Sequence, residues 1–226
     1  WERYAWLKAR PVAGDIDAGE RLLASLRPFV YRRYLDFTAI DGLREMKAKI
    51  EAEVQRREMA DDLKLGRGGI REIEFFVQAM QIIYGGRTPA LQCRGLLPSL
   101  DRLRDAGLIA DASHRQLRRA YLFLRRLENR VQMVRDAQVH HLPEQPADLQ
   151  RMAVSLGYPD SEALRADLER YRGDVERLFT GLLGGDTAAS LDDGRSAQSV
   201  QALTAMGFVH AQQHADRMSA LFASPG

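Results

Sequence analysis

The sequence predicts an all-α protein, an antiparallel helical bundle with at most one or two short strands. Apolar residues recur at intervals of three and four in its three most regular segments, as on the buried face of a helix. Those segments are residues 70–84, 111–135 and 161–183. Residues typical of helix ends stand at their boundaries. Only residues 29–37 and 63–65 have a composition that suits an extended chain.

Eight helices follow from this periodicity and from residues that begin or end a helix. Pro11 and Pro28 are expected to end the first two helices, because proline has no backbone N–H to donate. Thr38 and Ser161 suit N-caps, and Gly85 suits a helix end. The expected helices are residues 1–9, 20–26, 38–58, 70–84, 96–106, 111–135, 146–156 and 161–183.

The stretches between these helices are less regular. Residues 12–19 are expected to form a loop, and residues 29–37 fit an extended segment, a helix or coil equally well. Residues 63–65 could form a short strand. Asp61 and Asp62 are expected in a turn or an N-cap, because neighbouring side chains point apart on any regular element.

Composition describes an ordinary globular chain. Its 226 residues are 45% hydrophobic and 28% charged, with a net charge of +2, which gives no general attraction to nucleic acid. Cys93 is the only cysteine, which excludes an internal disulfide and fits a reducing, cytoplasmic environment. The sequence shows no run of apolar residues long enough to span a membrane. Because it begins at Trp1, we expect a piece of a longer protein.

A glycine-rich segment precedes the most apolar helix. It reads Lys64-Leu65-Gly66-Arg67-Gly68-Gly69-Ile70-Arg71-Glu72-Ile73-Glu74-Phe75-Phe76-Val77-Gln78. Glycine tolerates positive φ and adds no side chain, so the backbone N–H groups of such a loop suit an anion. Lys64 could meet a phosphate as a flexible point charge.

Glu72 is unusual in this helix. It lies outside the narrow polar stripe that holds Arg71 and Glu74, among apolar neighbours. A carboxylate there must be paired, bound to a cation or protonated. An alternative is that Arg71 and Glu74 form a local ion pair, while Glu72 stabilises the positive end of the helix.

The same segment resembles the signature of the bacterial glutamine synthetase adenylyltransferase/adenylyl-removing enzymes, and related uridylyltransferases carry a similar Gly-Gly-Leu-Arg-Asp pattern. The likeness covers most of residues 1–183, and the Arg71-Glu72 form resembles the amino-terminal, adenylyl-removing half. Other stretches carry it in the same order: Trp1-Glu2-Arg3-Tyr4-Ala5, Arg27-Pro28-Phe29-Val30-Tyr31-Arg32-Arg33-Tyr34-Leu35-Asp36-Phe37, Gly85-Gly86-Arg87, Leu91-Gln92-Cys93-Arg94-Gly95-Leu96-Leu97-Pro98 and Ala120-Tyr121-Leu122-Phe123-Leu124-Arg125-Arg126-Leu127-Glu128-Asn129.

The resemblance implies an enzyme that adds and removes AMP on a tyrosine of glutamine synthetase, with removal by phosphorolysis. It implies Mg²⁺, ATP or ADP with phosphate, and the PII signalling protein as a partner. None of these ligands is expected to bind tightly to residues 1–226 alone. Residues 1–84 would complete the nucleotidyltransferase head, residues 85–184 would form a helical bundle, and residues 185–226 a linker with weak helices.

Roles carry over from the resemblance residue by residue. Arg71, Glu72 and Glu74 would be catalytic, with Glu72 also serving a metal. The nucleotide-binding residues would be Lys64, Gly68 and Gly69. Glu72 would face the nucleotidyltransferase core and be exposed or poorly satisfied without it. The Asp-x-Asp metal pair after a glycine-serine loop is expected upstream of Trp1, so residues 1–226 alone are expected to be inactive.

Two alternatives have no catalytic role. In the first, the segment only packs a regulatory or scaffolding helical domain. In the second, helix 111–135 binds nucleic acid, since residues 115–135 hold seven arginines against the single acid Glu128. We favour a solvated arginine face, then an acidic protein partner or a neighbouring domain, over nucleic acid. His140-His141 are expected in a loop and not at a metal, because neighbouring histidines diverge.

Overall fold

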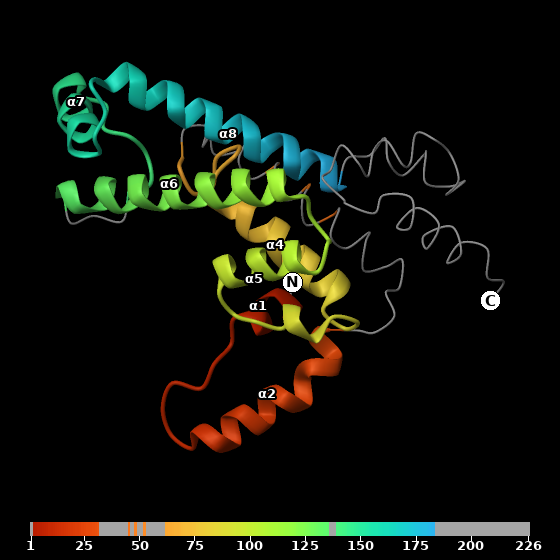
Figure 1. Ribbon diagram of the computed structural model, residues 1–226. Coiled ribbons are helices and arrows are strands. Elements are labelled where there is room, and N and C mark those ends of the chain that lie inside the picture. The colour runs from red at the N-terminus through yellow and green to blue at the C-terminus, as the bar shows by residue number, and fades with distance from the viewer. Residues whose placement is uncertain are drawn as a thin grey trace, which may run out of the picture.

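The computed structural model describes residues 2–31, 62–135 and 139–183 and the single positions Glu45, Ala48 and Ala52. Every regular element in these residues is a helix, and they contain no strand (Figure 1). The elements are α1 Glu2–Leu7, α2 Ile16–Val30, α4 Ile70–Tyr84, the 3₁₀ turn η1 Pro89–Leu91, α5 Leu96–Asp105, α6 Asp111–Arg135, α7 Pro146–Ser155 and α8 Ser161–Leu183. The predicted all-α class is confirmed.

Helices α6 and α8 form the long antiparallel pair of the bundle. The short helix α7 joins them and packs on α8, so the chain reverses direction between the two (Figure 1). Helix α4 contacts both α6 and α8, and α5 packs on α4 and α6. At the other side of α4 lies α1, along which α2 packs. This arrangement places the segment before α4 next to the long pair.

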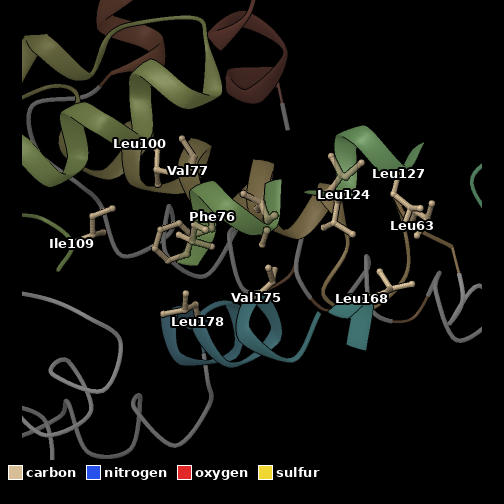
Figure 2. Close-up of a cluster of buried hydrophobic side chains, with 14 of the residues drawn as sticks. Leu63, Phe76, Val77, Leu100, Ile109, Leu124, Leu127, Leu168, Val175 and Leu178 are labelled. Atoms are coloured by element: carbon tan, nitrogen blue, oxygen red, sulfur yellow. The ribbon is translucent and has the colours of Figure 1, made fainter. Parts of the chain in front are cut away.

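One hydrophobic core joins the helices from α4 to α8. Figure 2 shows side chains from α4, α6 and α8 meeting there, with Leu63 entering the core from the segment before α4. This core lies on both sides of the domain boundary predicted after residue 84, and that division of the chain stays a prediction. The fully buried large side chains of this core include Leu63, Ile70, Ile73, Phe76, Met80, Leu91, Leu100, Leu103, Ile109, Leu117, Leu124 and Leu127.

Two details of the second helix were predicted wrongly. Helix α2 begins at Ile16, inside the predicted loop, because the Asp15 side chain caps it by accepting a hydrogen bond from the Ala18 N–H at 2.8 Å. It also continues through Pro28 to Val30. Proline costs a helix one backbone hydrogen bond, and Pro28 is solvent-exposed, where water can satisfy the released carbonyl.

The strand predicted at residues 63–65 is also wrong, because these residues lie in turns. Predictions for residues 32–37, for most of 38–58 and for 184–226 fall outside the described residues, although Glu45, Ala48 and Ala52 are helical. No helix in the described ranges combines the length and the apolar composition needed to cross a membrane.

A buried amide ties the 85–99 region to α4. The Gln81 side chain is 3% exposed, and its Nε2 donates to the carbonyl oxygens of Leu91 and Cys93, each at 2.7 Å. The same nitrogen lies 3.0 Å from Ser99 Oγ on α5. Because buried carbonyls need a donor, one side chain from α4 fixes the path of the chain between η1 and α5.

We expect Gln81→Leu to lower the free energy of unfolding by about 1–3 kcal/mol, because leucine fills the space but removes the amide donor that the Leu91 and Cys93 carbonyls share. Urea unfolding followed by circular dichroism measures the change. Gln116→Leu on the exposed face of α6 is the control and should shift stability by less than about 0.5 kcal/mol. Equal effects of the two variants would contradict the tethering role.

Candidate functional site

The glycine-rich segment 62–69 forms compact turns that contact α4, α8 and His140. Asp62 organises its start, since its Oδ1 accepts hydrogen bonds from the N–H groups of Lys64 at 2.8 Å and Leu65 at 2.7 Å. The predicted turn at Asp62 is confirmed. Arg172 of α8 donates from Nη2 to the Asp62 carbonyl at 2.9 Å, and the Leu63 N–H donates to the His140 carbonyl at 2.6 Å.

Two glycines of the segment are explained by close packing. Gly68 has φ +65°, and a Cβ placed on it would lie 2.3 Å from the Arg172 carbonyl oxygen and 2.5 Å from the Arg172 Cα. The turn therefore touches the backbone of α8, where no other residue fits. At Gly69 a Cβ would meet the carbonyl oxygens of Gly66 at 2.7 Å and Lys64 at 2.8 Å.

The backbone N–H groups that the sequence predicted for an anion are engaged within the segment. In the part of the chain that the structure describes, the turn and the first helical turn satisfy one another, so the segment is pre-formed without a ligand. The bonds are Gly66 N–H to the Asp62 carbonyl, Gly69 N–H to the Gly66 carbonyl, Ile70 N–H to the Leu63 carbonyl, Arg71 N–H to the Lys64 carbonyl, and Glu72 N–H to the Gly69 carbonyl.

Glu72 closes this set of hydrogen bonds. Its side chain is 8% exposed, and Oε2 accepts from the Gly68 N–H at 3.1 Å. Glu72 is the third residue of α4, and a glutamate there that reaches back to a preceding N–H stabilises the helix start. The expectation that Glu72 would be exposed or poorly satisfied is wrong. Sequence reasoning missed that the backbone of the turn itself supplies a donor.

Arg71 and Lys64 form the charged face of the segment. Arg71 is exposed, Lys64 is half-buried, and the backbone bond between the two residues keeps them adjacent. Neither side chain has an ion-pair partner among the residues that the structure describes. The alternative of a local ion pair between Arg71 and Glu74 is wrong, because Glu74 instead binds Lys8, which directly follows α1, at 3.3 Å.

Two residues of α6, Tyr121 and Glu128, lie near the motif, and sequence reasoning assigned a role to neither. Burial raises the pKa of the Tyr121 phenol, and the Arg125 guanidinium opposes that rise. The carboxylates of Glu74 and Glu128 are close enough to raise the Tyr121 pKa further. Tyr121 therefore lies near Glu74 of the motif and near a charged pair on α6.

That pair on α6 includes a buried acid. Glu128 is 3% exposed, and its Oε2 accepts from Nη1 of Arg125 at 2.7 Å. His140 Nδ1 lies 3.2 Å from the other oxygen, without the alignment of a hydrogen bond. Because the His140 carbonyl also accepts from the Leu63 N–H, Glu128 is connected to the glycine-rich turn. Glu128 is the single acid in residues 115–135, and that was the sequence signal for a carboxylate with a specific partner.

A metal does not fit the described residues as they stand. Residues 2–31, 62–135 and 139–183 hold no group of three histidine, cysteine or acidic side chains that could coordinate an ion. Glu72 supplies one carboxylate, of which one oxygen already accepts a hydrogen bond. Mg²⁺ needs several oxygen ligands in octahedral geometry, so a metal at Glu72 would depend on groups outside these residues.

Comparison with known proteins shows the family to which the chain is related. Residues 44–183 match the family model of GlnD PII-uridylyltransferase. A bifunctional glutamine synthetase adenylyltransferase/adenylyl-removing enzyme of Stenotrophomonas maltophilia (strain R551-3) is 66% identical over 183 residues, which is 81% of this chain and 20% of that protein. Proteins of the same name from Xanthomonas axonopodis pv. citri (strain 306) and Hahella chejuensis are 58% and 50% identical, over 85% of this chain and 20% of theirs. The chain thus spans about a fifth of the length of these relatives.

Gly68→Ala tests the packing of the turn. We expect it to lower the free energy of unfolding by about 3 kcal/mol or more, because the new methyl group overlaps the α8 backbone and the residue keeps a positive φ. Denaturant unfolding measures the loss.

Gly157→Ala is the matched control. Gly157 has φ +91°, but a Cβ placed on it would meet nothing within 4 Å, so only backbone strain of about 1 kcal/mol is expected. A Gly68 variant no less stable than the Gly157 variant would show that the contact with Arg172 is not tight.

Proposed function

Because the chain belongs to the GlnD PII-uridylyltransferase family and its relatives are bifunctional glutamine synthetase adenylyltransferase/adenylyl-removing enzymes, we propose that it is part of a nucleotidyltransferase that adds and removes AMP on glutamine synthetase. We assign the chain to the adenylyl-removing half. The Arg71-Glu72 form of the motif supports that choice through its resemblance to the amino-terminal half.

The observation that carries the proposal is the pair of cations at the motif. The Arg71 N–H donates to the Lys64 carbonyl at 3.0 Å, and neither side chain has an ion-pair partner in residues 2–31, 62–135 and 139–183, whereas arginines such as Arg67, Arg170 and Arg177 bind an acid. An exposed guanidinium and an ammonium carried by hydrogen-bonded backbone positions suit a phosphate. The rigid turn beneath them holds their backbones in one arrangement, which is what a binding site needs.

Removal of AMP by phosphorolysis would use this charge directly. An oxygen of inorganic phosphate attacks the AMP phosphorus, the bond from phosphorus to the tyrosine oxygen breaks, and the products are ADP and a free tyrosine hydroxyl. Arg71 and Lys64 would attract the phosphate and offset its charge as it approaches the AMP phosphate. Glu74, which binds Lys8, would orient water.

Other parts of the proposal need groups that the described residues do not supply. Mg²⁺ and nucleotide, when bound, would supply charge neutralisation at the phosphates, and Glu72 as a metal ligand stays a prediction. Asp15-Ile16-Asp17 has the Asp-x-Asp spacing, but Asp15 caps a helix and follows no glycine-serine loop. We therefore propose that the 226 residues alone are inactive. The PII protein as a partner rests on the resemblance only.

A scaffolding role is the second candidate, and the hydrogen bonds of the turn favour it. Gly68, Gly69 and Glu72 each have a packing or hydrogen-bonding role that needs no ligand. In that case the motif would join α4 to α8 and leave catalysis to other residues. Arg71 and Glu72 distinguish the two candidates, because substitutions there can change activity without changing the fold.

We expect Arg71→Ala, in the full-length enzyme, to lower kcat/KM for phosphate in deadenylylation by about 100-fold, since one charge-assisted contact to a reacting phosphate contributes about that much. The KM for phosphate should rise. Unfolding should change by less than about 0.5 kcal/mol, because Arg71 is exposed. Arg165→Ala, which removes an exposed arginine on α8, should leave both quantities unchanged. An Arg71 variant as active as the Arg165 variant would remove Arg71 from the site.

Glu72→Gln separates catalysis from packing. The glutamine oxygen can still accept from the Gly68 N–H, so we expect the fold to persist with a loss of at most about 1 kcal/mol. If Glu72 has a catalytic or metal-binding charge, deadenylylation falls by about 100-fold or more. Activity assays and denaturant unfolding of the full-length enzyme measure both, with Glu162→Gln on the surface of α8 as the control. Retained activity with lowered stability would favour the scaffolding candidate.

A further inference from the structure

One exposed face of α6 carries three arginines and two aliphatic side chains, with the polar Asn129 between Arg126 and Met133. The arginine stripe consists of Arg115, Arg119, Leu122, Arg126 and Met133, all of them exposed. Their spacing of four, three, four and seven residues places them on one side of the helix. The opposite side of α6 is buried against α4 and α8. The stripe is therefore a second face of α6, distinct from its core face.

The arginines of the stripe differ from Arg118 and Arg125 on the same helix. Arg115, Arg119 and Arg126 make no ion pair with any residue that the structure describes. By contrast, Arg118 lies 3.7 Å from Asp101, and Arg125 binds Glu128. Elsewhere in the bundle exposed arginines pair with acids three residues away, as Arg151, Arg170 and Arg177 do with Asp148, Asp167 and Asp174.

This arrangement is unfavourable for the isolated helix. Like charges one turn apart, as at Arg115 and Arg119, repel each other. Asp111, four residues before Arg115, forms no ion pair with it in the described structure. Leu122 is 42% exposed and Met133 is 72% exposed on the same line. These cations and aliphatic side chains would both gain from contact with an acidic partner that also carries apolar groups.

We propose that the arginine stripe is a docking surface for an acidic amphipathic helix of a separate partner protein. The three- and four-residue spacing on α6 matches the spacing of side chains on an opposing helix, so leucines of the partner would pack on Leu122 and Met133. Glutamates beside them would pair with Arg115, Arg119 and Arg126. The charge needed by the partner is thus negative, and the geometry needed is helical.

Nucleic acid fits this surface less well. Base stacking needs aromatic side chains, and the stripe has aliphatic ones. Three uncompensated arginines along one helix neutralise few phosphates, and the chain carries a net charge of only +2. Aliphatic side chains between the arginines favour a protein, because they gain from burial against apolar groups. This inference does not depend on the catalytic proposal, since it uses none of the motif residues.

The test uses a designed peptide of about 20 residues, with leucine and glutamate at three- and four-residue spacing, as the probe. Its binding to the 226-residue protein is measured by fluorescence anisotropy at about 100 mM salt, where surface charges are only partly screened. We expect the triple variant R115A/R119A/R126A to weaken binding by at least 10-fold. The matched control R151A/R170A/R177A also removes three exposed arginines and should change affinity by less than twofold.

A second variant tests the aliphatic part. L122S/M133S keeps every charge, and we expect it to weaken peptide binding by at least fivefold. If the two triple arginine variants lost peptide affinity equally, binding would depend only on net charge, and the proposal would be overturned. Tighter binding of a duplex DNA oligonucleotide than of the peptide would assign the stripe to nucleic acid instead. Failure of the peptide to bind once the chain is extended to the length of its relatives would overturn the separate partner, because the same polypeptide would then cover the stripe.

Discussion

The arrangement of the bundle depends on the backbone contact between Gly68 and Arg172. Gly68 has a left-handed backbone conformation and no side chain, so the turn can approach the α8 backbone closely. A Cβ placed on Gly68 would lie 2.3 Å from the Arg172 carbonyl oxygen. At the same place Arg172, which is 7% exposed, donates to the Asp62 carbonyl, and Glu72 accepts from the Gly68 N–H. These contacts join the start of α4 to the middle of α8. Since α6 packs against both helices, its position follows from theirs.

Helix boundaries were predictable where the apolar period and the end residues agreed. For α4, α6 and α8 the predicted and observed ranges coincide. Each of these helices buries a broad apolar face, and its apolar residues recur at helical spacing along the whole range. At α2 the prediction was wrong at both ends. The Asp15 cap outweighed the small residues that follow it, and Pro28 sits where the lost hydrogen bond faces water. Local propensity alone does not reveal which side of a helix faces solvent.

The motif shows the same limit for charged residues. Sequence spacing indicated a pair between Arg71 and Glu74, but Glu74 binds Lys8, the residue after α1. Sequence spacing also indicated a carboxylate among apolar groups at Glu72, and the turn supplies its donor. Both partners come from contacts that no pattern within one helix encodes. Glu128 and Tyr121 were missed for the same reason, since their proximity to the motif arises from the packing of α6 on α4.

The glycines of the motif do not by themselves distinguish a nucleotide site from a packing joint. Gly68 and Gly69 are required by the fold, and Glu72 completes the same set of hydrogen bonds, so a purely structural protein would need all three. Arg71 is different, because it is exposed and the turn does not use its guanidinium. A cation that the fold does not need, held on a turn that the fold makes rigid, is the part of the motif most simply explained by a ligand. The functional content of the segment therefore lies in its surface charges, while its glycines and Glu72 explain why those charges keep one position.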